Sequence, residues 1–381
     1  MACFYKRGKT WTFSMDIGKD EFGKRKKKAV GGFRTKKEAE EAAAKMEVEL
    51  AKGIYIEEKN ITFGEFVEEW LKLYKPTVKL STYNLRIDQL KIVKHYLNNK
   101  KLSKIKKIEL QQIVNKLQEK YSKCYISGIE SILSLIFKKA LELEIINSNP
   151  MQFVKMQRRP TELKEDEKEK IKYLEKNEVE LFLNECKKNC HDYYALFLLL
   201  VYTGMRIGEA LGLKWQDIDI QNSTIDINKT LYADKTIKGY ILQAPKTRRS
   251  RRIIEVSPFV IDELKKHKQQ QNLEKIKYRH IWHDKNFVFT SKRYPGYPLP
   301  YNQARMSMKK ILSRIGLNYD ISPHALRHTH TSLLAQAGVG LEEIMDRLGH
   351  EDDKITRSVY LHVTKEMKKE SVKKFDLLME K

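Results

Sequence analysis

The stretch from Lys155 to Lys172 constrains the fold of this chain more than any other feature. It holds Arg158-Arg159-Pro160 followed by alternating Glu and Lys, with few apolar residues. Such a segment cannot bury a core and is typical of an exposed connector. A chain of 381 residues is also long enough for two or three domains. We therefore expect separately folded parts on the two sides of this connector.

Residues 1–55 have the pattern of a small sheet followed by one helix. The residues from Trp11 to Ile17 alternate between apolar and polar, as in a half-buried strand, and a second strand is predicted from Lys26 to Phe33. Together they form a small hairpin sheet. Thr35 and Glu38 have the spacing of a capping box, which predicts a helix to about residue 52.

This first part is strongly basic. Residues 1–37 carry twelve Lys and Arg against three acidic residues, a local net charge of +9. The whole chain has 74 Lys and Arg against 50 Asp and Glu, which indicates a polyanionic partner: nucleic acid first, an anionic membrane surface second. A soluble basic protein with a solvated charged face is the alternative. The residues predicted to contact DNA are Lys24, Arg25, Lys26, Lys27 and Lys28.

Residues 61–155 have helical periodicity throughout. Thr62 and Glu65 have the spacing of a capping box, and Ile129, Leu133 and Ile136 recur at the spacing of one helix face. After the first helix, further helices are predicted at about residues 79–97, 108–120 and 122–143. The pattern predicts a basic four-helix bundle and by itself indicates no chemistry.

Residues 173–381 mix helices and strands. The segment from Ala195 to Val201 is apolar nearly all round, which predicts a buried helix that ends at Thr203-Gly204, and Asn177 is predicted to cap the helix before it. Further strands are predicted at 224–227, 240–242, 252–256 and 287–290, and further helices at 258–271 and 301–315. The expected fold class is multidomain, mainly α with small β-sheets, with an α+β domain at the C-terminus.

Side chains suited to phosphoryl chemistry recur between Ser322 and Val363. His324 and Arg327 are three apart, just after a proline, so they would share one face of a helix. Leu348-Gly349-His350 indicates a helix stop followed by an exposed imidazole, and Tyr360 follows ten residues later. Arg and His can hold the non-bridging oxygens of a phosphate, and a phenol can attack phosphorus.

Each of these residues also has a simpler interpretation. A single His is usually a surface or satisfied core residue, and the chain has 19 Tyr, most of which must be structural. His324, His328 and His330 could suggest a metal site, but they lack the carboxylate or Cys partners of the usual zinc spacings. The four Cys are too few for a disulfide framework, so reduced thiols are expected. Neither a membrane span nor a signal peptide is predicted.

The order of the C-terminal motifs resembles the active site of the tyrosine recombinases, the phage integrase family, which has H-x-x-R, L-G-H and a terminal Tyr in this order. Upstream, T-G-M-R-I-G-E resembles the family's first active-site block and K-T-x-x-S-x-R its hairpin lysine. By this resemblance residues 1–55 form an arm-type DNA-binding domain, 61–155 a helical core-binding domain and 173–381 the catalytic domain with its tail. The implied catalytic residues are Arg206, Lys246, His324, Arg327, His350 and Tyr360.

The resemblance implies a site-specific DNA recombinase that integrates and excises a mobile genetic element. Tyr360 would attack phosphorus to form a 3′-phosphotyrosine, with His324 as the base, and Lys246 would protonate the leaving 5′-oxygen. The two arginines would clamp the phosphate, and His350 would donate a further hydrogen bond. No metal, ATP or other cofactor is implied. The implied partners are double-stranded DNA with core and arm sites, a homo-tetramer on DNA, an excision factor and a host DNA-bending protein, in a bacterial cytoplasm at the nucleoid.

Several alternatives stay open. Lys235 and Lys238 lie just upstream of the hairpin lysine and could replace it. Glu209, one turn after Arg206, could orient that guanidinium or form an ordinary surface pair with it. The amphipathic tail from Lys365 to Lys381 could dock on a neighbouring protomer or on its own domain. A type IB topoisomerase, or an inactive architectural DNA-binding protein, would also fit the sequence.

Overall fold

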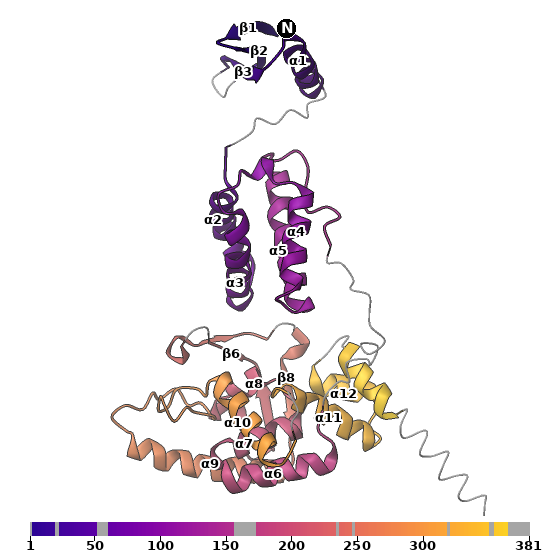
Figure 1. Ribbon diagram of the computed structural model, residues 1–381. Coiled ribbons are helices and arrows are strands. Elements are labelled where there is room, and N and C mark those ends of the chain that lie inside the picture. The colour runs from indigo at the N-terminus through magenta and orange to yellow at the C-terminus, as the bar shows by residue number, and fades with distance from the viewer. Residues whose placement is uncertain are drawn as a thin grey trace, which may run out of the picture. The chain divides into compact units, whose positions relative to one another are not determined.

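The computed structural model describes residues 2–19, 23–51, 60–155, 173–233, 236–245, 248–317, 321–349 and 354–364. The chain divides into two compact units, Met1–Thr161 and Glu162–Lys381. The predicted fold class, mainly α with small antiparallel sheets, is confirmed (Figure 1). Within the described ranges, no helix combines the length and the apolar composition that crossing a bilayer requires.

A three-stranded antiparallel sheet and one helix form the N-terminal part of the first unit (Figure 1). The elements, with the strands in the order β1-β2-β3, are β1 (Cys3–Arg7), β2 (Thr10–Lys19), β3 (Arg25–Phe33) and α1 (Lys36–Ala51). The expectation of a two-stranded hairpin was wrong, because β1 adds a third strand to the sheet. In β1 only Phe4 is partly buried, so its sequence lacks the alternation that marks a strand, and Gly8 (φ 65°) turns the chain into β2.

The N-terminal sheet has its own small core. Phe13 and Met15 of β2 are buried together with Ala39, Ala43 and Met46 of α1. Because residues two apart on a strand share a face, the alternation in β2 directs both large side chains at the helix. The basic residues of β3 therefore belong to a small folded scaffold rather than to an isolated charged run.

The second part of the first unit is the predicted helical bundle. Its helices are α2 (Phe63–Tyr74), α3 (Leu80–Leu97), α4 (Lys107–Gln118) and α5 (Lys123–Glu142), with short 3₁₀ turns at Lys75–Thr77 and Leu102–Lys104. The predicted capping box is present: the Thr62 hydroxyl accepts from the Glu65 N–H, and the Glu65 carboxylate accepts from the Thr62 N–H. Ile129, Leu133 and Ile136 of α5 are fully buried in its core, as their spacing predicts.

The second unit is built around the apolar helix α7. Its helices are α6 (Lys176–Asn189), α7 (His191–Thr203), α8 (Ile207–Leu211), α9 (Pro258–Lys277), α10 (Tyr301–Arg314), α11 (Ala325–Gln336) and α12 (Leu341–Leu348), and residues 354–364 are also helical. α7 contacts α6, α9 and α11, so its apolar side chains are covered on several sides.

Two small antiparallel sheets accompany these helices. One has the order β4-β5-β8, with β4 (Ile218–Asp219), β5 (Thr224–Ile227) and β8 (Arg252–Glu255), and the other pairs β6 (Thr230–Tyr232) with β7 (Ile241–Gln243). Short 3₁₀ turns lie at Trp215–Asp217, Ile237–Gly239 and Arg248–Ser250.

Three local predictions in this unit were wrong. Glu175, not Asn177, is the N-cap of α6, and its N–H donates to the Glu178 carboxylate. Residues 287–290 form only isolated bridges, which pair Phe287 with Lys214 and Thr290 with Pro298, so the hydrogen bonds to each neighbouring segment are too few for a strand. α9 runs on to Lys277, since nothing after residue 271 breaks the helix.

Candidate active site

Arg206 owes its place to the end of the buried helix α7. The helix ends at Gly204, which has a left-handed backbone (φ 61°), as predicted from Thr203-Gly204. A Cβ at this position would lie 2.5 Å from Cδ2 of His330, so only glycine fits this close approach. The chain then turns through Met205 to Arg206, immediately before α8.

The Arg206 guanidinium is held by a buried carboxylate. Its Nη1 donates to Oε1 of Glu209 at 3.0 Å, and its backbone N–H donates to Oε2 at 2.9 Å. The Glu209 side chain is 1% exposed and that of Arg206 is 35% exposed, so the pair is not an ordinary surface contact. Burial by itself raises the pKa of Glu209, but the charges of Arg252 and Arg206 and the hydrogen bonds they donate lower it below its usual value.

Arg327 lies on α11 and is buried at 2% exposure. Its Nη1 donates to the Gly204 carbonyl and its Nη2 to the Leu348 carbonyl, both at 2.7 Å. His324 is exposed and is the N-cap of α11, so it lies just before the first residue of the helix, Ala325. The guanidinium therefore joins the end of α7 to the end of α12.

His330 is a structural residue of this region. Its Nδ1 donates to the Val201 carbonyl at 2.8 Å, and its Nε2 accepts from Nε of Arg347 at 3.3 Å, which fits the neutral ring. Burial and the Arg347 charge lower the pKa of His330 to about 3. His324 and His328 meet edge to face at 5.2 Å. Among the described residues, no three His, Cys, Asp or Glu side chains come together as metal ligands would.

The end of α12 meets the segment of the K-T-x-x-S-x-R motif. Gly349 has φ 70°, which confirms the predicted helix stop. A Cβ there would lie 2.9 Å from the Arg249 carbonyl and 3.2 Å from Cα of Ser250, so these backbones touch. Lys246 and His350 themselves lie outside the described residues, as does Lys235.

Tyr360 lies within the helical stretch 354–364 and is partly buried. It packs against a small apolar cluster that includes Ala335 of α11 and Leu348 of α12, so it shares neighbours with the elements that carry Arg327 and Gly349. Its segment was expected only to be mixed in polarity, and the helix is a new finding. The tail from Lys365 to Lys381 lies outside the described residues.

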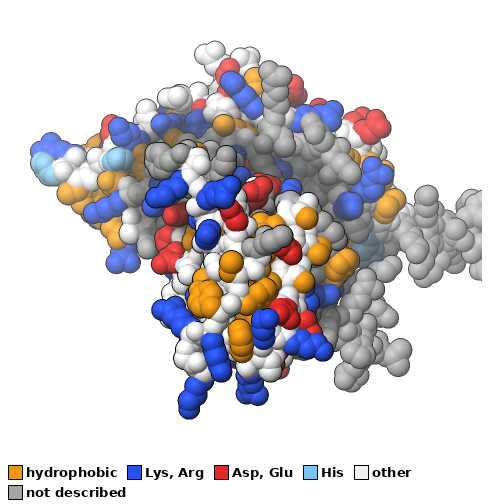
Figure 2. All heavy atoms as spheres, turned by 90° about the horizontal axis from the view of Figure 1, so that it is seen from above, with side chains coloured by type: hydrophobic (Ala, Val, Ile, Leu, Met, Phe, Trp, Pro, Cys, Tyr) orange, Lys and Arg blue, Asp and Glu red, His pale blue; other side chains and the backbone are white. Residues whose placement is uncertain are grey.

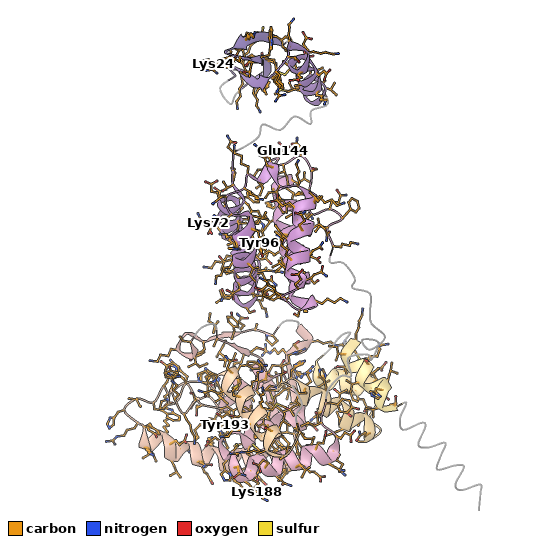
Figure 3. All side chains as sticks on the ribbon, viewed as in Figure 1. Lys24, Lys72, Tyr96, Glu144, Lys188 and Tyr193 are labelled. Atoms are coloured by element: carbon orange, nitrogen blue, oxygen red, sulfur yellow. The ribbon has the colours of Figure 1, made fainter. Side chains whose placement is uncertain are left out.

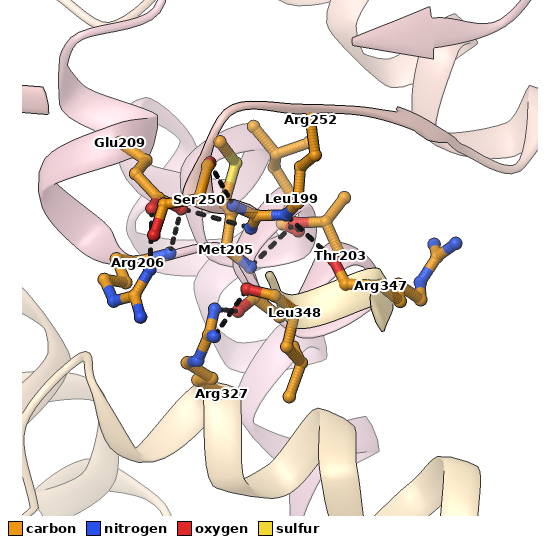
Figure 4. A network of polar contacts seen from close by, with 11 residues as sticks. Leu199, Thr203, Met205, Arg206, Glu209, Ser250, Arg252, Arg327, Arg347 and Leu348 are labelled. Carbon is orange, nitrogen blue, oxygen red and sulfur yellow. Dashed lines mark hydrogen bonds and ion pairs between the residues drawn. The ribbon is translucent and has the colours of Figure 1, made fainter. Parts of the chain in front are cut away.

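Two further arginines complete the network and were missed by sequence reasoning. Arg252 of β8 donates to Glu209 and to the backbone carbonyl of Arg347, next to the Leu348 carbonyl that Arg327 binds (Figure 4). The Arg347 side chain points away from this group and donates to His330. The signal for Arg252 was present, because it is the last residue of K-T-x-x-S-x-R. Arg347 gave no signal, since an Arg in the last turn of a helix is common on a surface.

The predicted DNA-contacting residues of the N-terminal part lie along the start of β3. Lys24 precedes the strand and is seen at the edge of the sheet in Figure 3; the other four residues, from Arg25 to Lys28, belong to β3 and pair with the end of β2. Lys24 to Lys27 are exposed and Lys28 is partly buried. Figure 2 shows Lys and Arg side chains next to hydrophobic side chains on the face that it draws.

Comparison with known families matches three successive parts of this chain. The model of the phage integrase family matches residues 172–367. An arm DNA-binding domain matches residues 3–50, and an N-terminal SAM-like domain of phage integrases matches residues 62–118. The first of these matches alone covers more than half of the chain.

Individual proteins agree with these families. The chain is 33% identical to the prophage ps2 probable integrase of Lactococcus lactis, over 81% of each chain. It is 31% identical to a XerC-like tyrosine recombinase of Caldanaerobacter subterraneus, over 97% of this chain and 96% of the relative. The Tn1549 transposon integrase, solved in complex with transposon right end DNA, shares the fold with a TM-score of 0.64 at 22% identity, over 81% of this chain and 99% of that one.

Proposed function

This chain belongs to the phage integrase family and is a tyrosine-type site-specific recombinase; we propose that it cuts and rejoins DNA through a 3′-phosphotyrosine to integrate and excise a mobile genetic element. Two integrases of mobile elements support the biological role: the prophage relative and the transposon integrase with the same fold. No relative reported above is a topoisomerase or an architectural protein, and neither alternative is favoured.

One arrangement carries the assignment of the site. Two guanidinium groups, 121 positions apart in the sequence, are both fixed at the end of α7: Arg206 by the buried Glu209, and Arg327 by the Gly204 carbonyl. A pentavalent phosphorane carries more negative charge than the phosphodiester from which it forms, so fixed positive charge stabilises the transition state more than the ground state. Arginine suits this task because its planar fork matches phosphate oxygens.

The proposed reaction transfers a phosphodiester bond of DNA to the tyrosine. The phenolic oxygen of Tyr360 bonds to phosphorus while the bond from phosphorus to the 5′-oxygen breaks. The phenolic proton passes to His324, and Lys246 gives a proton to the departing oxygen, leaving a 3′-phosphotyrosine and a free 5′-hydroxyl. His350 donates a further hydrogen bond to the phosphate. A free phenol has a pKa of about 10 and an acid or base contributes about 10²–10⁴-fold, so both proton transfers matter at neutral pH.

No metal, ATP or other cofactor is needed in this scheme. The positive charge that a metal ion supplies in many phosphoryl transfers comes from the arginine pair and the other cationic groups. The bond from tyrosine to phosphorus retains the energy of the broken phosphodiester. Attack by a 5′-hydroxyl therefore restores the DNA, and attack by a different 5′-hydroxyl exchanges strands.

The partners follow from this chemistry. Exchange between two duplexes breaks one bond on each of four strands, and each protomer brings one nucleophile, so the proposed assembly is a homo-tetramer on DNA. The basic N-terminal sheet would bind arm sites and the helical bundle core sites, in line with the arm and SAM-like matches. An excision factor and a host DNA-bending protein are further proposed partners, and the proposed location is the bacterial nucleoid.

Covalent trapping tests the proposal. A core site is first selected by binding from a random duplex pool and then nicked near the cleavage position, so that the short 5′-hydroxyl fragment diffuses away and the adduct accumulates. Tyr360→Phe should bind the site as wild type does and form no adduct. Tyr301→Phe, which alters an exposed phenol on α10, is the matched control and should form the adduct normally. An adduct from Tyr360→Phe would refute the assignment.

A further inference from the structure

The carboxylate of Glu209 binds two arginines, of which only one faces outward. Oε1 accepts from Arg206, as described above, and Oε2 also accepts from Nη2 of Arg252 at 3.2 Å. The Arg252 side chain is 8% exposed, compared with 35% for Arg206. Arg252 is thus less exposed than Arg206, and it contacts the same carboxylate from within the protein.

All three nitrogens of the Arg252 guanidinium donate within the protein. Nε donates to the Arg347 carbonyl at 2.8 Å and Nη1 to the Ser250 carbonyl at 3.1 Å, in addition to the bond from Nη2 to Glu209. A planar fork can meet three acceptors in three directions, whereas a lysine ammonium is a single point of charge. The contacts therefore use the shape of Arg as well as its charge.

The Arg347 carbonyl is one of two successive carbonyls at the end of α12 that arginines hold. Arg252 binds the Arg347 carbonyl, and Arg327 binds the next one, that of Leu348. The last carbonyls of a helix have no partner within the helix and carry the negative end of its dipole, so two guanidinium groups stabilise this end. The chain leaves α12 at Gly349, so the position of this helix end depends on these contacts.

We propose that Arg252 is a positioning residue for DNA cleavage: through Glu209 it sets the guanidinium of Arg206, and through the Arg347 carbonyl it sets the end of α12 from which the chain continues to His350. The inference rests on the proposed function, because positioning has meaning only if Arg206 binds the scissile phosphate. Arg252 does not touch the substrate and acts through these two contacts.

Arg252→Lys tests the role of the fork. Lysine keeps the positive charge beside Glu209. Its single ammonium nitrogen cannot replace the three hydrogen bonds that the three guanidinium nitrogens of Arg252 donate in different directions. In single-turnover cleavage of the nicked substrate at saturating protein, we expect the rate to fall about 10²-fold, as for a small misplacement of a reacting group. The affinity for the DNA site should be unchanged. Arg251→Lys, one position away on an exposed side chain, is the matched control and should cleave at the wild-type rate.

A double-mutant cycle with Glu209→Gln separates positioning from a general loss of fold. If Arg252 acts on Arg206 through Glu209, the two losses should combine to clearly less than their product, since both substitutions break this connection and only Arg252→Lys also affects the end of α12. If Arg252→Lys does not fold, Glu209→Gln alone should show the loss of rate with normal DNA affinity. Independent, multiplicative losses, or a wild-type rate in either variant, would overturn the inference.

A methylphosphonate substrate gives a measurement that does not depend on the stability of the fold, because the same variant is compared on two substrates. One charged oxygen of the scissile group is replaced by a neutral methyl, so less positive charge is required of Arg206. The rate penalty of Arg252→Lys should be clearly smaller on this substrate than on the phosphodiester, and an equal penalty on both would contradict the positioning role. If the wild-type protein formed no covalent adduct with DNA, the proposed function would be refuted, and this inference would be refuted with it.

Discussion

Acidification should destabilise the C-terminal unit through His330. The buried ring donates from Nδ1 to the Val201 carbonyl and accepts at Nε2 from Arg347, so a second ring proton has no acceptor and would meet a positive charge. Burial first, and then the Arg347 charge, lower the pKa of this ring from 6.5 to about 3. The unfolded chain therefore binds the extra proton before the folded one does. Stability that is complete above pH 6.5 is lost as the pH falls from there toward 3.

The size of this effect follows from the two pKa values. At pH 5 the unfolded ring is almost fully protonated and the folded ring almost not at all, which costs about 2 kcal/mol relative to pH 8. The result hardly depends on the folded pKa as long as that value stays below about 4. A loss of this size is large against the stability of about 5–15 kcal/mol that is usual for folded proteins.

His330→Gln isolates the contribution. The amide does not titrate between pH 5 and 8, and its oxygen can still accept from Arg347. Urea unfolding of the full chain at pH 8 and pH 5, followed by hydrogen exchange in peptides of α7 and α11, reports the stability of this unit alone. Wild type should lose about 2 kcal/mol more than the variant on going to pH 5. His280→Gln, at an exposed histidine, should retain the wild-type pH dependence. Equal losses in wild type and His330→Gln would refute the reasoning.

Three further outcomes are expected. Replacing Lys24 to Lys28 with Gln should weaken DNA binding and flatten its dependence on salt, because fewer counterions are released; an unchanged salt slope would rule out phosphate contacts there. A chelator such as EDTA should leave the yield of the covalent adduct unchanged, and dependence on added metal would contradict the cofactor-free scheme. Gly204→Ala should lower the thermal stability by more than about 1 kcal/mol, because the backbone is left-handed and the new Cβ would lie 2.5 Å from His330; a neutral result would show that the ring can move aside.

Local pattern was enough to predict much of the fold. The i, i+3, i+4 apolar spacing gave the helices of the bundle, and Gly204 and Gly349 gave the ends of α7 and α12, because only glycine takes a left-handed backbone without strain. β1 was not predicted, since a five-residue strand with one partly buried side chain has almost no pattern of its own. Residues 287–290 have the composition of a strand but form only isolated bridges to Lys214 and Pro298, and composition cannot reveal how long such a pairing runs.

The sequence predicted which residues belong to the candidate site, but it did not predict the hydrogen bonds between them. Arg206, His324 and Arg327 stand in motifs whose order is visible in the sequence. The burial of Glu209, and its second bond to Arg252, depend on where β8 and α12 fold in space. A carboxylate one turn after an arginine looks the same in sequence whether it lies on a surface or in a core.

The most direct test of the account is the chemical identity of the residue joined to DNA. The trapped adduct is digested with nuclease and trypsin, and the modified peptide is sequenced by mass spectrometry. Cleavage after Arg357 and Lys365 gives the peptide Ser358–Lys365, in which Tyr360 is the single tyrosine. The account predicts a nucleotide phosphate on Tyr360 in this peptide. A nucleotide on any other residue, or an adduct that forms with this peptide unmodified, would contradict it.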